Sequence, residues 1–114
     1  MTDNSEYIKK SKKIYIYGLI DPRDELVIEN VRYVGKTNNI HRRLLKHVQD
    51  SRNKGTAPTH KWISKLNYQR PQHIILEECN ENTWQKAERK YIKLLRKSNR
   101  LLNILKGVVI RVNQ

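Results

Sequence analysis

Hydrophobic and polar positions divide this chain into a few short elements. Residues 13–20 and 27–34 are dense in β-branched and aromatic side chains, which is typical of strands. An Asp-Pro-Arg-Asp turn over residues 21–24 separates them, so they are expected to form a long hairpin. Residues 73–77 (His-Ile-Ile-Leu-Glu) predict a third strand.

Successive side chains point to opposite faces of a strand. This alternation places Tyr17 on one face of the first strand and Ile16 on the other. On the returning strand, Val31, Tyr33 and Gly35 are expected to share a face. The two tyrosines can therefore lie side by side on the sheet.

A helix is predicted directly after the hairpin, with Asn38 or Asn39 as its cap. Its core-facing positions recur every four residues and are Ile40, Leu44 and Val48. Arg43 and His47 lie one turn apart beside this stripe, whereas Arg42 and Lys46 point further outward. A guanidinium and an imidazole are thus presented together at the end of the hairpin.

Two further helices are expected, a short one over residues 59–66 and a long one from a Thr83 cap to about Lys97. The long helix carries a carboxylate, Glu88, among its inward-facing positions, which are otherwise Trp84, Tyr91 and Leu95. A carboxylate on an apolar stripe is costly unless it is paired or binds a cation. Glu88 is therefore a candidate functional residue.

The chain has 114 residues, enough for one domain. Residues 1–12 are polar and basic and predict a flexible N-terminal arm, and residues 13–114 are assigned to a single domain. The pattern of elements predicts an α/β (α+β sandwich) fold: a small, mostly antiparallel, three-stranded sheet flanked by helices.

The net charge is +13, from 24 Lys and Arg against 11 Asp and Glu, which favours a nucleic acid partner. No apolar run approaches the ~20 residues of a membrane-spanning helix, and no signal peptide pattern is present. Cys79 is the only cysteine, so no disulfide can form within the chain. These features favour an intracellular, cytoplasmic protein that does not bind membranes.

Taken in order, the polar residues match a known pattern, and the chain resembles the GIY-YIG nuclease superfamily. Ile16-Tyr17 corresponds to the first motif, although Tyr15 stands in place of its glycine, and Tyr33-Val34-Gly35 corresponds to the second. The family's arginine, histidine, glutamate and asparagine fall at Arg43, His47, Glu88 and Asn103. The resemblance covers residues 13–106.

This resemblance implies a metal-dependent endonuclease that hydrolyses DNA phosphodiester bonds. Glu88 would hold one divalent cation, Mg²⁺ or Mn²⁺. Tyr17 would be the general base, Tyr33 would position the water or the phosphate, and Arg43 would grip phosphoryl oxygens. His47 would relay a proton or bind phosphate. Gly35 and Asn103 would support the site structurally.

Residues that could contact nucleic acid are Lys36, Arg42, Lys46, His60 and Lys61. Small members of this kind resemble proteins of phages and mobile elements, which would place the protein in a host cell. Double-strand cleavage would need a homodimer or two successive cuts. Two other readings are a non-catalytic nucleic-acid-binding module with the same fold and a basic RNA-binding protein of ribosomal type.

Overall fold

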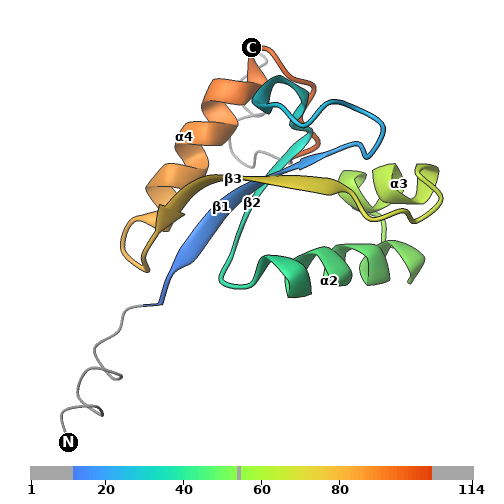
Figure 1. Cartoon of the computed structure of the whole chain (residues 1–114), viewed down its shortest axis with the longest axis horizontal. Helices are drawn as coiled ribbons and strands as arrows, with labels where there is room; N and C mark the ends of the chain where they lie inside the picture. Colours follow the sequence, from blue (N-terminus) through green and yellow to red (C-terminus); the bar gives the residue numbers. More distant parts are fainter. Residues whose placement is uncertain (1–11, 54, 104–114) are drawn as a thin grey trace, which may run out of the picture.

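A computed structural model describes residues 12–53 and 55–103, which form a three-stranded antiparallel sheet with helices on both faces (Figure 1). The strand order is β2-β1-β3, so β1 (Ile14–Ile20) is central. It pairs with β2 (Tyr33–Thr37) on one side and β3 (Gln72–Cys79) on the other. The predicted fold class is confirmed. The predicted N-terminal arm lies outside the described residues, apart from Lys12.

The helices are divided between the two faces of the sheet (Figure 1). The helices α2 (Ile40–Arg52) and α3 (Pro58–Lys65) cover one face, and α4 (Trp84–Arg96) covers the other. Proline at the first position of α3 is well placed because its missing N–H has no helical partner there. None of the described helices is long and apolar enough to cross a membrane.

Two hydrophobic clusters form the core, one on each face. Tyr17, from β1, packs with α2 and α3 in a cluster that also contains Leu19, Leu44, Trp62, Ile63 and Leu66. The cluster under α4 contains Ile16, Ile20, Val31, Val34, Cys79, Ala87 and Leu95. The alternation predicted for β1 is thus confirmed, and Tyr17 is held in the layer between the sheet and α2.

The predicted returning strand over residues 27–34 is wrong at its start. Residues Ile28–Asn30 form the short 3₁₀ helix η1, and β2 begins only at Tyr33 and continues to Thr37. The Asn99 side chain donates hydrogen bonds to the carbonyls of Ile28 and Val31, so these groups need no sheet partner. Val31 therefore packs under α4, on the face opposite to the one expected.

The α4 cap also differs from the prediction. Thr83 occupies the N-cap position, but its side chain makes no capping bond to the helix. Its hydroxyl instead accepts a hydrogen bond from the backbone N–H of Asn80, and the Asn80 carbonyl accepts from the N–H of Trp84. For α2 the prediction is confirmed, because the Asn39 side chain accepts from the Arg42 N–H.

The segment after α4 returns along the free edge of β2. The Leu102 N–H donates to the Arg32 carbonyl at 2.7 Å. The Asn103 side chain then accepts from the Val34 N–H at 2.9 Å and donates to the Val34 carbonyl at 2.8 Å. An edge strand exposes unpaired backbone groups, and here one asparagine satisfies both groups of the residue between Tyr33 and Gly35.

Candidate active site

A tyrosine and a histidine meet in the layer between the sheet and α2. The Tyr17 hydroxyl oxygen lies 2.8 Å from Nε2 of His47, and both side chains are buried, at 0 % and 2 % exposed. His47 follows Leu44 by three residues, so the burial of Leu44 in the core places His47 over the central strand. Both side chains are therefore shielded from bulk water.

Tyr33 completes a group of three rings. Its ring centroid lies 6.2 Å from that of Tyr17 and 5.3 Å from that of His47. The predicted pairing of the two tyrosines is confirmed. Gly35 lies opposite Tyr17 in the β1–β2 register, and a Cβ atom there would come within 2.6 Å of the Tyr17 hydroxyl and 2.8 Å of the Tyr33 ring. Only glycine leaves room for both rings.

Arg43 lies one helical turn before His47 and is half-buried. Burial raises the pKa of both Tyr17 and Tyr33, and the Arg43 cation acts against that rise. The pKa of Tyr17 still lies well above its ordinary value. Among the described residues, Arg43 is therefore the cation that favours the ionised form of the two phenols.

His47 is neutral at physiological pH. Burial, the Arg43 cation and His60 lower the pKa of His47 to about 4, and Asp50 opposes this only weakly. With Nε2 bonded to Tyr17, the second ring nitrogen, Nδ1, is buried and has no hydrogen-bond partner among the described residues. A neutral imidazole holds one hydrogen and one lone pair, so it can pass a proton from one nitrogen to the other.

Glu88 comes from α4, the helix on the other face of the sheet. Burial is the largest cause of the raised pKa of Tyr17 and Tyr33, and the charge of Glu88 adds to it. Burial raises the pKa of Glu88, while Lys36 and Arg89 lower it. Among the described residues Glu88 has no ion pair within 4 Å, because the Lys36 ammonium lies over the Trp84 ring, 4.4 Å from its centroid.

The donor set at Glu88 suits a hard cation held by few protein ligands. The described residues contain no group of three or more His, Cys, Asp or Glu that could enclose a metal ion. A half-buried carboxylate without a cationic partner fits Mg²⁺, which keeps several waters and uses one or two carboxylates together with substrate phosphate. Glu88 is the residue here that would hold such an ion.

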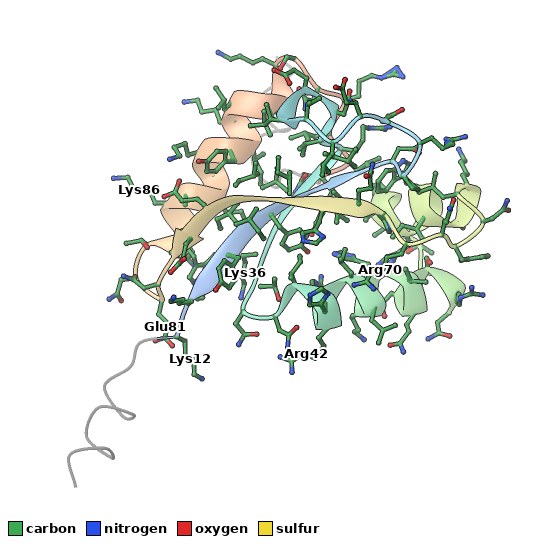
Figure 2. The ribbon with its side chains drawn as sticks, in the orientation of Figure 1. Lys12, Lys36, Arg42, Arg70, Glu81 and Lys86 are labelled. Atoms are coloured by element: carbon green, nitrogen blue, oxygen red, sulfur yellow. The ribbon has the colours of Figure 1, made fainter. Side chains whose placement is uncertain are left out.

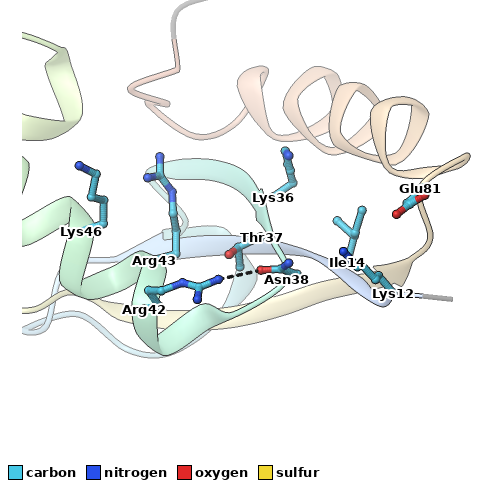
Figure 3. A pocket seen from close by; sticks show the side chains of 9 residues that line it. All are labelled: Lys12, Ile14, Lys36, Thr37, Asn38, Arg42, Arg43, Lys46 and Glu81. Atoms are coloured by element: carbon cyan, nitrogen blue, oxygen red, sulfur yellow. Dashed lines mark hydrogen bonds between the residues drawn. The ribbon is translucent and has the colours of Figure 1, made fainter. Parts of the chain in front are cut away.

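Arg43 also lines a basic cavity of about 660 Å³ (Figure 3). Five of its nine lining residues are cationic, and Glu81 is the single acidic one; the cations are Lys12, Lys36, Arg42, Arg43 and Lys46. Figure 3 shows Lys36, Arg43 and Lys46 extending to the same side, while Arg42 donates to Asn38 at 3.3 Å. We call this cavity the basic groove. Its charge suits a phosphate backbone.

A second cavity, of about 370 Å³, also includes Arg43 in its lining, together with Tyr33, His47, Asp50, His60 and Asn103 among others. We call it the histidine cavity. His60 thus lines the same cavity as His47 and lies beside Asp50, and it is not among the residues that line the basic groove. Lys61 is exposed on α3 and lines neither of these two cavities.

The sequence interpretation missed Asp50. This residue follows His47 by three positions, so it lies on the same side of α2. Its two carboxylate oxygens pair with Lys46, at 3.2 Å, and with His60 Nε2, at 3.9 Å. The i, i+3 spacing from His47 was the signal available, but the contact with His60 depends on how α3 packs against α2.

The family model described as GIY-YIG catalytic domain matches residues 7–103, most of the chain. The chain therefore belongs to the GIY-YIG family and carries a nuclease-type catalytic domain. The resemblance seen in the sequence is confirmed. Searches of the curated proteins and of the solved structures find no match to this chain.

Proposed function

We propose that this protein is an endonuclease that hydrolyses DNA phosphodiester bonds, with Tyr17 as general base and a divalent cation at Glu88. The observation that carries the proposal is the buried hydrogen bond between the Tyr17 hydroxyl and His47 Nε2. A phenol is a weak base at neutral pH unless a neighbour takes its hydrogen. His47, neutral and fixed at 2.8 Å, is that neighbour.

Proton transfer at Tyr17 requires no ionised phenol before the reaction. The Tyr17 hydroxyl gives its hydrogen to His47 Nε2 while its oxygen accepts a proton from the attacking water. This concerted exchange is consistent with the raised pKa of Tyr17, because a free phenolate is never formed. Tyr33, in contact with both rings, would orient the water.

Arg43 is the proposed ligand of the scissile phosphate. Arg43 lines both the basic groove and the histidine cavity. A planar guanidinium can donate two parallel hydrogen bonds to two phosphoryl oxygens. It would therefore bind the phosphate and stabilise the charge that builds up on these oxygens.

Glu88 supplies the carboxylate ligand for the metal. When bound, a divalent cation acts as a Lewis acid on a phosphoryl oxygen and on the leaving oxygen. GIY-YIG nucleases generally depend on such ions, and the half-buried carboxylate of Glu88, which has no ion pair with another described residue, supports the same requirement here. Mg²⁺ is the proposed ion, with Mn²⁺ as a substitute.

The basic groove is the proposed path of the DNA strand, with Lys36, Arg42 and Lys46 contacting phosphates. We propose single-strand cuts by one copy of the chain, with double-strand breaks requiring a dimer or two events. The proposed location is the cytoplasm, in a host cell if the gene belongs to a phage or mobile element.

Incubation of supercoiled plasmid with the purified protein tests this function. We expect nicked plasmid with Mg²⁺ or Mn²⁺, none with EDTA, and none with Glu88→Gln or Tyr17→Phe, which should still bind DNA. Glu29→Gln is the matched control, because Glu29 is exposed on η1 and should leave cleavage unchanged. Tight, salt-sensitive binding without cleavage under any of these conditions would instead support a non-catalytic binding module.

A further inference from the structure

A lysine, a tryptophan and a glutamate meet where β2 passes α4. The Lys36 ammonium lies over the Trp84 ring, 4.4 Å from its centroid. Trp84 and Glu88 are one turn apart on α4, so their side chains are neighbours on one side of the helix. Figure 3 shows Lys36 extending from β2 towards this helix. The lysine thus reaches the side of α4 that carries the proposed metal ligand.

Strand geometry places Lys36 on the α4 side of the sheet. Val34, two residues earlier in β2, is buried in the cluster under α4, and side chains two positions apart share a face. The cross-strand partner of Lys36, Ile16, belongs to the same cluster. Trp84 is half-buried against this cluster, and its backbone N–H donates to the Asn80 carbonyl at 3.2 Å. Sheet register and helix position therefore bring the ammonium and the ring together.

Lys36 does not pair with the neighbouring carboxylate. Among the described residues, no ion pair within 4 Å joins Lys36 to Glu88. The two groups are nevertheless close, because burial raises the pKa of Glu88 and the charge of Lys36 acts against that rise. Lys46, by contrast, pairs with its neighbour Asp50 at 3.2 Å. Trp84 offers Lys36 a different partner, since the face of an indole ring attracts a cation.

We propose that Trp84 is a positioning residue, whose ring holds the Lys36 ammonium beside the Glu88 carboxylate but not on it, and so leaves that carboxylate available to a divalent cation. This inference rests on the proposed metal site at Glu88. An ammonium paired with Glu88 would have to be displaced before a metal ion could bind. Held over the ring, Lys36 also keeps its charge at the basic groove, which it lines.

Binding of Mn²⁺ in the absence of DNA tests this inference without a measurement of activity. In ¹H–¹⁵N NMR spectra, added Mn²⁺ should broaden the amide signals of α4 around Glu88, and Glu88→Gln should abolish this effect. Trp84→Leu should weaken the Glu88-dependent binding about two- to fivefold, the range expected when an exposed lysine competes for the carboxylate. Trp84→Phe retains an aromatic face and should bind Mn²⁺ nearly as well as the wild type.

A double-mutant cycle separates competition by the lysine from a packing defect. Lys36→Gln should strengthen Mn²⁺ binding more in the Trp84→Leu protein than in the wild type, because only there is the lysine free to pair with Glu88. Ile92→Ala, on α4 and against the same hydrophobic cluster, is the packing control and should leave Mn²⁺ binding unchanged. Equal effects of Lys36→Gln in the two backgrounds, or wild-type Mn²⁺ binding by Trp84→Leu, would overturn the inference.

The Mg²⁺ dependence of single-turnover plasmid nicking gives a second readout. Trp84→Leu should need about two- to fivefold more Mg²⁺ for half of its maximal rate, and its rate at saturating Mg²⁺ should stay near that of the wild type. An unchanged Mg²⁺ dependence, with or without a lower maximal rate, would overturn the positioning role and leave the nuclease function standing. No metal-dependent nicking and no Glu88-dependent Mn²⁺ binding by the wild type would overturn the proposed function, and this inference with it.

Discussion

Gly35 lies directly opposite Tyr17 across the β1–β2 pair, and the space above its Cα atom is occupied by the Tyr17 hydroxyl. The glycine is thus part of the site geometry, because any side chain there would displace a reactive group. A second glycine, Gly18, faces Val31 in the cluster on the opposite face of the sheet, where a Cβ atom would come within 2.7 Å. The two positions allow site effects to be separated from core effects.

Gly35→Ala should displace Tyr17 and Tyr33, weaken the Tyr17–His47 hydrogen bond and lower cleavage at least tenfold. Overpacking should also reduce the free energy of unfolding by about 1–3 kcal/mol. Gly18→Ala should cost a similar amount of stability but retain cleavage per folded molecule. Urea denaturation and plasmid nicking at a temperature where both variants are folded would measure this. Equal loss of cleavage in both variants would contradict the role of Gly35.

Tyr17→Phe removes the partner of a buried nitrogen. His47 Nε2 would then be left unsatisfied, which should lower the free energy of unfolding by about 1–3 kcal/mol, in addition to abolishing cleavage. Tyr15→Phe, on the same strand, is the comparison, since Tyr15 is only half-buried and has no side-chain hydrogen bond among the described residues. If Tyr17→Phe were as stable as Tyr15→Phe, the buried hydrogen bond would not be present in solution.

His47 should make stability depend on pH. Its pKa is lowered to about 4 in the folded state against an ordinary value of 6.5, so the unfolded chain binds the proton more readily between these values. The contribution of His47 to stability is therefore complete above pH 6.5 and falls as the pH drops towards 4, by up to roughly 3 kcal/mol. Denaturant titrations from pH 4 to 7.5 would measure it.

A matched pair of variants isolates this pH effect. His47→Gln should flatten the slope of stability against pH, whereas His41→Gln should retain it because His41 is exposed at the start of α2. The same slope in wild type and His47→Gln would show that other groups cause the acid sensitivity.

The residues of the basic groove other than Arg43 should govern DNA binding rather than the chemical step. Arg42→Gln and Lys12→Gln should each weaken DNA binding several-fold and reduce the slope of log K against log salt by about 0.9. Lys86→Gln is the control, because it also removes one positive charge. Lys86 lies on the outer side of α4, away from Lys36 and Arg42 (Figure 2). Fluorescence anisotropy at several salt concentrations would measure this. An equal effect of all three variants would indicate only a general attraction by net charge.

The hydrophobic pattern of the sequence predicted a feature correctly where that feature depends on residues within a single helix or strand. The stripe of Leu44 and its neighbours predicted α2, and the same periodicity placed Arg43 and His47 together beside it. Strand alternation likewise predicted that Tyr17 and Tyr33 share a face. The pattern failed over residues 27–32, where apolar side chains indicated a strand. There the Asn99 side chain satisfies the backbone carbonyls that would otherwise bond within a sheet.

By itself, the sequence determined the family, the fold class and the identity of the reactive side chains, because these depend on periodicity and on residue types at short spacing. Only the tertiary structure decided which nitrogen of His47 faces Tyr17, that Asn103 closes the edge of β2 at Val34, and that Asp50 lies beside His60. These relationships join residues on different elements, so they depend on how helices and strands pack and not on any local pattern.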